Sequence, residues 1–239
     1  MIISLCNVTK EYNLDEETII TPIQNVSLDI RQGEFILIIG RSGSGKTTLL
    51  NLVAGLIKPS SGEVLIDNHD LRNMTDTQLS SLRNRRMGFI FQFPSLLPSL
   101  TILQNVVLPT TFHSRHRKPN AHKRAADLLQ MLGLGERKKV YPRQLSAGEQ
   151  KRAVIARSLI NEPEILLADE PTSDLDERTE QEIMTMLRET HANGMTIMMV
   201  THSTDLIPYA TRALKVEDGG LLDVTAAKQP LTDAVRECA

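Results

Sequence analysis

The sequence contains little cysteine. Its two cysteines, Cys6 and Cys238, lie near opposite ends of the 239-residue chain and lack the spacing of metal ligands. Small secreted domains depend on several disulfides, whereas cytosolic proteins keep their thiols reduced. The sequence therefore predicts no structural disulfide, and it indicates a reducing compartment.

Positive charge is not in surplus either. The formal net charge is −2, which is not the basic balance that non-specific nucleic-acid binding requires. One local basic run, His113–Lys118, is expected to be a solvated loop. No nucleic-acid partner is expected.

Long apolar runs are also missing. No stretch approaches the roughly 18 apolar residues of a membrane-spanning helix, and the N-terminus lacks the charged start and apolar core of a signal peptide. We therefore expect a cytoplasmic protein that is soluble by itself. The length suffices for one large α/β domain, or for a core with a smaller appended lobe.

What the sequence does contain is a phosphate-binding loop at Gly40–Thr48, GRSGSGKTT. It follows the apolar run Phe35–Ile39 and precedes a second apolar run, which is the strand–loop–helix context that such a loop requires. The glycines let successive backbone N–H groups face an anion at a helix N-terminus. We expect Lys46 to contact the β- and γ-phosphates and Thr47 to offer its hydroxyl to Mg²⁺, while Thr48 packs or caps the first helical turn.

Four continuous apolar runs predict strands that are buried on both faces. Such runs are typical of parallel strands flanked by helices, so a doubly covered α/β sheet is expected. Ligands bind beyond the carboxyl ends of these strands, and the polar residues found there should converge on the nucleotide. The runs are Phe35–Ile39, Gly88–Phe91, Ile165–Ala168 and Thr196–Val200, and the polar residues are Gly40, Gln92, Asp169, Glu170, Thr201 and His202.

The N-terminal part predicts a different kind of sheet. Apolar residues at Ile3 and Leu5, and again along 26–30, alternate with polar ones, which favours antiparallel strands with one covered face. Between them, Lys10–Asn13 and the acidic Asp15–Glu17 are expected to form a loop. Tyr12 would then lie just outside a strand, where an aromatic ring either stacks on a base or covers the rim of the core.

The remaining segments predict helices and a hairpin. Prolines and helical spacing of apolar residues between Ser95 and about Pro142 indicate an inserted helical lobe, and a further helix should begin near Ser146 and end before Pro163. The stretch Ala213–Leu221 resembles a hairpin with a glycine turn. The tail from residue 225 carries no prediction.

Asp169 and Glu170 are adjacent carboxylates at the end of a buried strand. Downstream of a phosphate-binding loop, one suits Mg²⁺ and the other suits a water-orienting role near the γ-phosphate. Gln92 and His202 have side chains that can hydrogen-bond metal-bound water or a phosphate oxygen. Either could equally be structural when it is considered alone.

The stretch Leu145–Gln150, LSAGEQ, closely resembles the LSGGQ signature of ABC ATPases, and the order of the other motifs matches that family over roughly residues 2–224. The matches are Tyr12 to the A-loop, Gly40–Thr47 to the Walker A motif, Gln92 to the Q-loop, Ile165–Glu170 to the Walker B motif, Ser173–Asp176 to the D-loop and His202 to the switch histidine.

This resemblance implies an α/β fold: a P-loop NTPase core of the ABC ATPase type, with an antiparallel β subdomain, an inserted α-helical subdomain at approximately 95–160 and a C-terminal tail at 225–239. It implies binding of ATP and Mg²⁺ and hydrolysis of ATP. The implied catalytic residues are Glu170, His202, Gln92 and Lys46, and the implied metal site comprises Thr47, Gln92 and Asp169. The implied nucleotide-binding residues are Tyr12, Gly40, Arg41, Ser42, Gly43, Ser44, Gly45, Lys46, Thr47, Thr48, Ser146 and Gly148.

Two residues depart from the family signature: Ala147 replaces the first glycine, and Glu149 stands where glutamine is usual. In this family the signature serine and second glycine face the γ-phosphate bound by the other subunit. The retained Ser146 and Gly148 therefore favour a working site in a dimer, which we expect to be a homodimer. The Cβ of Ala147 would be unfavourable if that position required a positive φ.

The flanking stretch Gly88–Thr101, with Asn105 and Val106, looks most like the LolD/MacB/FtsE-type subgroup. That resemblance implies a transmembrane permease partner of the FtsX/MacB type, a peripheral location on the inner face of the cell membrane, and export or mechanical transmission as the use of ATP. The apolar loop around Gln92 is expected to form part of a groove for a coupling helix of the permease. Its large apolar residues are Phe91, Phe93, Leu96, Leu97 and Leu100.

Two other functions remain as alternatives. A soluble ABC ATPase acting on nucleic acid or ribosomes would carry coiled-coil or zinc insertions, or two cassettes in one chain, and the sequence shows neither. A regulatory module that binds ATP without hydrolysing it is disfavoured by Lys46, Glu170 and His202.

Overall fold

The computed structural model describes residues 1–13, 15, 18–112 and 120–227. The expected basic run at 113–118, Glu16 and Glu17 of the expected acidic loop, Cys238 and the tail beyond 227 lie outside these residues. Among the described residues no helix is long and apolar enough to cross a membrane. Cys6, the cysteine that is described, is free and exposed.

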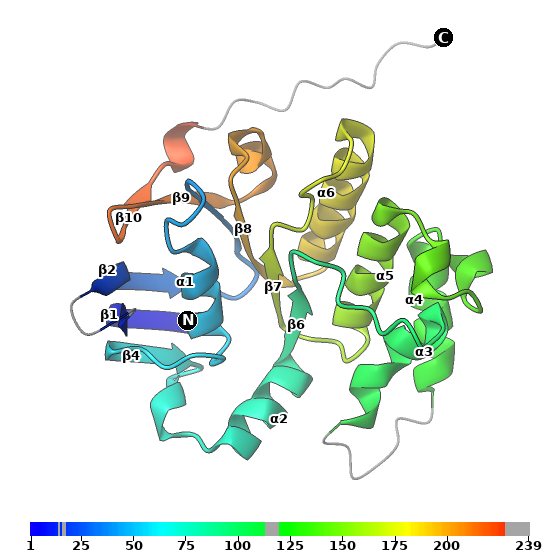
Figure 1. Cartoon of the computed structure of the whole chain (residues 1–239), viewed down its shortest axis with the longest axis horizontal. Coiled ribbons are helices and arrows are strands. Elements are labelled where there is room, and N and C mark those ends of the chain that lie inside the picture. The colour runs from blue at the N-terminus through cyan, green and yellow to red at the C-terminus, as the bar shows by residue number, and fades with distance from the viewer. Residues whose placement is uncertain (14, 16–17, 113–119, 228–239) are drawn as a thin grey trace.

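A six-stranded sheet in the order β10-β9-β3-β8-β7-β6 forms the core (Figure 1). The strands from β9 to β6 pair in parallel, and β10 pairs antiparallel with β9. This confirms the expected parallel α/β sheet. The bounds are β3 Phe35–Ile39, β6 Met87–Ile90, β7 Ile165–Asp169, β8 Thr196–Thr201, β9 Arg212–Glu217 and β10 Gly220–Asp223.

The two faces of β3 explain why its sequence is apolar throughout. Phe35, Leu37 and Ile39 belong to the core packed against the helical part of the chain, whereas Ile36 and Ile38 belong to the core shared with α1 and the antiparallel sheet. Side chains alternate between the faces of a strand, so a strand covered on both sides needs apolar residues at every position. Helices that contribute residues to these two cores include α1 Lys46–Val53, α5 Ala147–Leu159 and α6 Glu177–Ala192.

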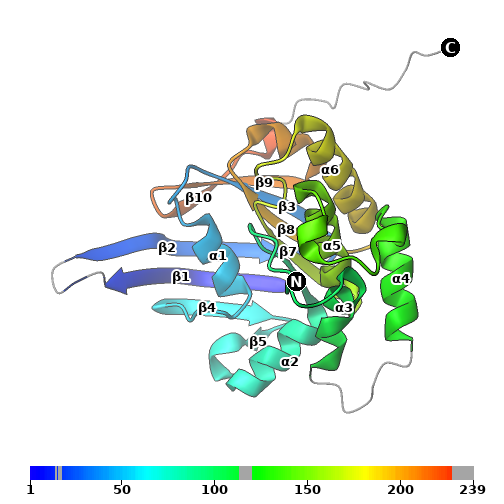
Figure 2. The same ribbon diagram turned by 45° about the vertical axis from the view of Figure 1, so that its right-hand side comes forward.

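A second sheet, in the order β2-β1-β4-β5, is antiparallel and lies on the α1 side of the core (Figure 2). Its strands are β1 Ile3–Asn13, β2 Ile19–Ile30, β4 Ser61–Ile66 and β5 His69–Asp70. The expectation that Lys10–Asn13 is a loop is wrong, because β1 continues through Tyr12, which pairs with Ile20 of β2. Hydrogen bonds with β2 extend β1 beyond three register shifts. Both faces of the strand are exposed there, so apolar residues no longer alternate with polar ones along the sequence.

The helical segments follow β5 and lie largely on the other side of the core sheet (Figure 2). Helices α3 Ile102–Val107, α4 Ala121–Met131 and α5 pack together there. Helix α2 Asp76–Arg86, by contrast, adds Leu79 to the core shared with α1 and the antiparallel sheet. The helical spacing expected between Ser95 and about Pro142 is found in α4, which buries Ala125 and Leu129, and the helix expected from near Ser146 is α5. Short 3-10 turns connect these elements at Leu71–Asn73, Leu108–Thr111, Gly135–Arg137, Pro142–Gln144, Thr204–Tyr209 and Thr225–Ala227.

The expected C-terminal hairpin is confirmed as β9–β10. Asp218 has φ +49° and Gly219 has φ +78°. Two consecutive positive φ angles are what a tight two-residue hairpin turn requires. This hairpin extends the core sheet at the edge beside β3, and so next to the phosphate-binding loop.

Candidate nucleotide-binding site

The phosphate-binding loop runs from the end of β3 to the first turn of α1. Gly43 has φ +78° and Gly45 has φ +102°, and a Cβ on Gly45 would lie only 2.4 Å from the carbonyl oxygen of Pro22 in β2. Gly45 is also the N-cap of α1 and offers no side chain to the first helical N–H groups. These amides are therefore available to an anion, and the helix dipole favours one there.

Lys46 and Ser44 show how well the loop fits a phosphate. The buried Nζ of Lys46 donates to the carbonyl oxygens of Gly40 at 2.8 Å and Arg41 at 3.0 Å, so the ammonium is held inside the loop. The hydroxyl oxygen of Ser44 is buried and has no hydrogen-bond partner among the described residues. A buried hydroxyl without a partner, in the same loop as a fixed cation, suits the oxygen atoms of a bound phosphate.

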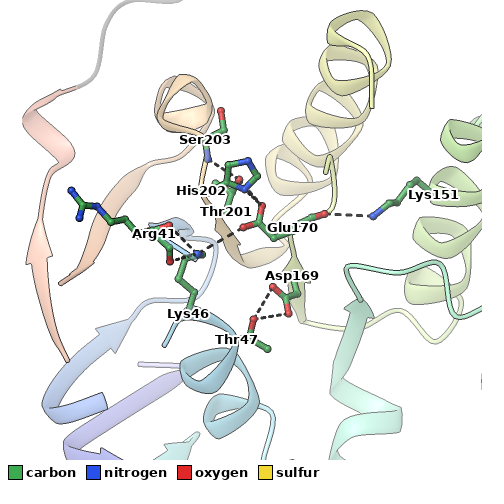
Figure 3. Close-up of polar contacts among 10 residues, drawn as sticks. Arg41, Lys46, Thr47, Lys151, Asp169, Glu170, Thr201, His202 and Ser203 are labelled. Atoms are coloured by element: carbon green, nitrogen blue, oxygen red, sulfur yellow. Dashed lines mark hydrogen bonds and ion pairs between the residues drawn. The ribbon is translucent and has the colours of Figure 1, made fainter. Parts of the chain in front are cut away.

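Asp169 and Thr47 bring two oxygen ligands together. The hydroxyl of Thr47 donates to the Asp169 carboxylate at 3.0 and 3.3 Å (Figure 3). Burial is the largest influence on Asp169 and raises the pKa of its carboxyl, while the bond from Thr47 lowers it. No group of three His, Cys, Asp or Glu side chains able to hold a metal occurs within the described residues. One hydroxyl and one carboxylate nevertheless suit Mg²⁺, which takes its other ligands from water and phosphate.

Glu170 follows directly and is held by Thr201, the last residue of β8, and by His202, which comes next. Its Oε2 accepts a hydrogen bond from the Thr201 hydroxyl at 3.1 Å and lies 3.0 Å from Nδ1 of His202 (Figure 3). Its Oε1 lies 3.9 Å from Nζ of Lys46. The residue adopts φ +45°, which is costly for glutamate and occurs mainly where the surroundings impose it. The expected convergence of strand ends is thus confirmed for the ends of β3, β7 and β8.

Gln92 lies just beyond β6, in the segment after Ile90. Its backbone carbonyl accepts a hydrogen bond from Nζ of Lys151, a buried lysine on α5. Sequence reasoning assigned no role to Lys151, and it placed Thr201 among the polar strand ends without assigning it a contact. Lysine and threonine are common residue types, and only the tertiary structure shows how deeply Lys151 and Thr201 are buried. A lysine within an apolar helical face is nevertheless a sequence signal for a buried, hydrogen-bonded ammonium.

The signature segment begins α5. Ser146 is the N-cap and forms a reciprocal capping box with Glu149: the N–H of Glu149 donates to the Ser146 hydroxyl at 3.2 Å, and the N–H of Ser146 donates to Glu149 at 2.8 Å. The hydrogen bond from Ser146 is the main cause of a lowered pKa at Glu149, and Arg137 also lowers it. Ala147 is the first residue of the helix and is absent from the residues with positive φ, so its Cβ is accommodated.

Tyr12 lies near the end of β1, on the ladder whose partner strand β2 brings Pro22 against Gly45. The Nζ of Lys10 lies 5.0 Å from the centre of the tyrosine ring, and the ring is partly exposed. An exposed ring on the sheet beside the phosphate-binding loop can offer a face to a base.

Together, the core sheet, the loop at the N-terminus of α1 and the carboxylates at the end of β7 define a P-loop nucleoside triphosphatase. The comparisons with known proteins are more specific. The profile of the ABC transporter family matches residues 23–173. The chain belongs to this family as an ATP-binding and ATP-hydrolysing subunit.

Several relatives are similar over most of their length. An ABC transporter ATP-binding protein of Thermotoga maritima is 41% identical, over 91% of this chain and 92% of the relative. The ABC transporter ATP-binding protein MJ0796 of Methanocaldococcus jannaschii is 44% identical, over 91% and 94%. A solved dimeric structure of MJ0796 in a post-hydrolysis state bound to ADP and Pi superimposes with a TM-score of 0.85 at 41% identity, over 93% of this chain and 98% of that one.

A longer relative carries its membrane part in the same chain. The macrolide export ATP-binding/permease protein MacB of Mannheimia succiniciproducens is 39% identical to this chain, over 98% of this chain but only 36% of MacB. The chain therefore resembles the ATP-binding portion of that protein. The likeness confirms the sequence resemblance to the MacB-type subgroup.

Proposed function

We propose that the ATP phosphates bind at the N-terminus of α1, with Lys46 beside the β- and γ-phosphates and Tyr12 beneath the adenine. Thr47 and Asp169 would hold Mg²⁺, with Gln92 reaching it from the end of β6; a bound Mg²⁺ would neutralise charge that develops on the phosphates. The support is the fit described above. A fixed ammonium, an unsatisfied buried hydroxyl and two converging oxygen ligands surround one loop.

Glu170 is the group that orients and deprotonates the attacking water in this proposal. Its Oε2 is occupied by Thr201 and His202, so its position at the ends of β7 and β8 is fixed by two bonds. A carboxylate held in this way can accept a proton without first reorganising. His202, which is largely exposed, can reach a γ-phosphate oxygen while it keeps Glu170 in place.

Two copies of the chain complete each site in this proposal. Ser146 and Gly148 lie at the start of α5, on the far side of β7 from α1 (Figure 1). From there they are suited to meet the γ-phosphate held by the phosphate-binding loop of a second copy. The dimeric solved structures of the relative MJ0796 support this arrangement.

The proposed membrane partner is a transmembrane permease of the FtsX/MacB type, docked by a short cytoplasmic helix. A pocket of about 450 Å³ lies beside β6, and its lining combines large apolar residues with polar ones that include Arg83 and Arg157. Its apolar lining includes Leu56, Met87, Phe89, Phe91, Leu108 and Phe112. Such a cleft suits the apolar face of an amphipathic helix.

The observation that carries this proposal is the adjacency of Phe91, which lines the pocket, to Gln92, which is predicted to face the nucleotide. If Gln92 moves when ATP binds, the neighbouring Phe91 moves with it and displaces the docked helix. We infer a peripheral location on the inner face of the membrane, and export or mechanical transmission as the work done. The relative MacB, which joins the ATP-binding and permease parts in one chain, supports this assignment.

Of the apolar residues expected to form the docking groove, Leu96 is buried core and Phe91 lines the pocket. Phe93 and Leu97 are exposed nearby. We expect Phe112→Asp, inside the pocket, to abolish co-purification with the permease, and Leu97→Asp to weaken it. Both variants should keep ATP affinity within a few-fold. Met131→Asp, at an exposed apolar site on α4 outside this pocket, is the matched control and should still assemble.

Retention of the permease by Phe112→Asp would contradict the proposed docking site. Loss of permease binding by Met131→Asp as well would show that a new charge anywhere on the helical part disturbs assembly, and that the pocket has no special role. ATP binding by each isolated subunit, measured with a fluorescent analogue, reports whether the fold is intact.

A further inference from the structure

Lys151 makes a contact that the nucleotide chemistry does not by itself require. The residue lies in the second turn of α5 and is only 4% exposed. Its Nζ donates to the backbone carbonyl of Gln92. It also donates, at 3.5 Å, to the backbone carbonyl of Glu170 (Figure 3). A single ammonium thus joins three segments that are far apart in the sequence: the segment after β6, the segment after β7 and the signature helix.

The surroundings of Lys151 act in both directions on the charged form that makes these bonds, and burial is the larger influence. Burial lowers the pKa of Lys151, while the negative charges of Asp174, Asp169 and Glu170 act in the opposite direction. A buried ammonium is costly unless hydrogen bonds and opposite charges compensate it, and both are present here. Removing the amine would leave the Gln92 carbonyl without this donor.

The bond to Glu170 holds a strained peptide. Glu170 has φ +45°, and its carbonyl oxygen accepts from the N–H of Ser173 at 3.2 Å as well as from Lys151. The backbone conformation of a residue sets the direction of its side chain. Lys151 therefore helps to keep the Glu170 carboxylate pointing toward Thr201 and His202.

The bond from Lys151 to Gln92 fixes the segment after β6. A second cation of α5, Arg157, donates to the carbonyl of Ser95 at 2.6 Å and to its hydroxyl at 3.0 Å. The segment Gln92–Ser95 is thus tied at both ends to one helix. That helix begins with Ser146, so a displacement of Gln92 would carry the signature residues with it, provided that the ties hold.

We propose that Lys151 is a positioning residue that makes the Q-loop, the strained Glu170 peptide and the signature helix move as one unit. In this way ATP bound in one site would set the orientation of the Ser146 and Gly148 groups that meet the ATP of the second copy. The inference rests on the proposed function, because it assumes that two copies share each site. It adds the element that links a subunit's own site to its partner's.

The kinetic test compares Lys151→Met, which keeps the aliphatic stem and removes the donor, with Lys151→Arg, which keeps charge and donors. Losing one charged hydrogen bond corresponds to a change of roughly tenfold to a hundredfold. We expect kcat to fall by about that factor in Lys151→Met and the Hill coefficient for ATP to fall toward 1, with ATP affinity of the isolated subunit nearly unchanged. Lys151→Arg should restore most of kcat. Arg152→Met is the matched control, because Arg152 is the next residue of the same helix and pairs with Glu182 of α6.

A distance measurement follows the motion itself. Labels are placed on exposed Cys6 of β1 and on Lys123→Cys of α4, with Cys238→Ser, in a Glu170→Gln background that retains the Glu170 carbonyl. Mg-ATP should change the label distance in this chain, and Lys151→Met should reduce the change. Lys151→Gln, which keeps a donor without the charge, should give an intermediate change and replaces Lys151→Met if that variant does not fold.

The outcomes separate the two proposals. A distance change that is the same with and without Lys151→Met, together with unchanged kcat and Hill coefficient, would overturn the role of Lys151 and leave the proposed function standing. No distance change on ATP binding in the parent chain would overturn the coupled motion assigned to Lys151, whereas failure of the parent chain to bind Mg-ATP would overturn the proposed function as well. An equal loss of activity in Arg152→Met would show that any cation of α5 is needed for folding, which also overturns the specific role of Lys151.

Discussion

Nδ1 of His202 and Oε2 of Glu170 lie 3.0 Å apart, across the ends of the neighbouring strands β8 and β7. The two side chains proposed to act on the γ-phosphate and on the attacking water therefore form one hydrogen-bonded unit. Thr201 adds a second bond to the same carboxylate oxygen. Residues that act as a unit are expected to show strongly non-additive effects when they are replaced.

The first prediction follows from this unit. Glu170→Gln should lower kcat by roughly 10²–10⁴-fold, because it removes the base while keeping its shape. Adding His202→Ala to Glu170→Gln should lower kcat little further, although His202→Ala alone should lower kcat strongly. Steady-state ATPase measurements on the four proteins of the cycle test this. Near-normal turnover in Glu170→Gln, or fully additive losses, would contradict the assignment.

The signature residues give a second prediction from two opposite exchanges. Ala147→Gly should change ATPase activity little, because Ala147 starts α5 without a positive φ and glycine supplies nothing that the backbone needs there. Gly148→Ala should impair the protein, since the new Cβ would lie 2.7 Å from Cγ2 of Thr179, whose hydroxyl is held by Asp176. A large gain in activity from Ala147→Gly would show an impaired natural site and would favour pairing with a different cassette.

Glu149 gives the third prediction, which concerns pH. Its pKa is lowered in the folded protein, chiefly by the Ser146 N–H. The charged cap therefore contributes stability above the ordinary carboxyl pKa of 4.5, and this contribution is lost as the pH falls through the folded value below it. At pH 7 the free energy of unfolding of the wild type should exceed that of Glu149→Gln by about 0.5–1 kcal/mol, and this difference should vanish in acid.

Thermal unfolding of both proteins between pH 7 and the acid range checks the Glu149 prediction. Glu136→Gln, at an exposed site in a 3-10 turn, controls for the loss of one negative charge. A difference between wild type and Glu149→Gln that grows in acid would have the wrong sign for a depressed carboxyl pKa.

Tyr12 gives the fourth prediction. If its ring carries the adenine, Tyr12→Ala should raise the Kd for ATP by roughly tenfold, within the range of base stacking on an aromatic ring. Tyr12→Phe should bind as wild type does, because the ring face is retained. Equal affinities for ATP in wild type and Tyr12→Ala, measured by titration calorimetry, would mean that Tyr12 only covers the rim of the sheet.

Much of this fold could be predicted from the sequence, because burial on both faces leaves a local mark. The uniform apolarity of β3, β7 and β8 located the core, and the glycines of the phosphate-binding loop located the site. The end of β1 could not be predicted, since Lys10–Asn13 pairs with β2 while exposing both faces. The role of Lys151 could not be predicted either, because its two acceptors are backbone carbonyls of distant segments.

The central claim is that two copies of this chain enclose ATP between the phosphate-binding loop of one and the signature of the other. Sedimentation of Glu170→Gln with and without Mg-ATP tests it most directly, with Lys46→Ala as the variant expected to bind ATP weakly and remain monomeric. The account predicts that Glu170→Gln shifts from monomer to dimer on adding Mg-ATP, with two ATP molecules retained per dimer. ATP-bound Glu170→Gln that stays monomeric would contradict it.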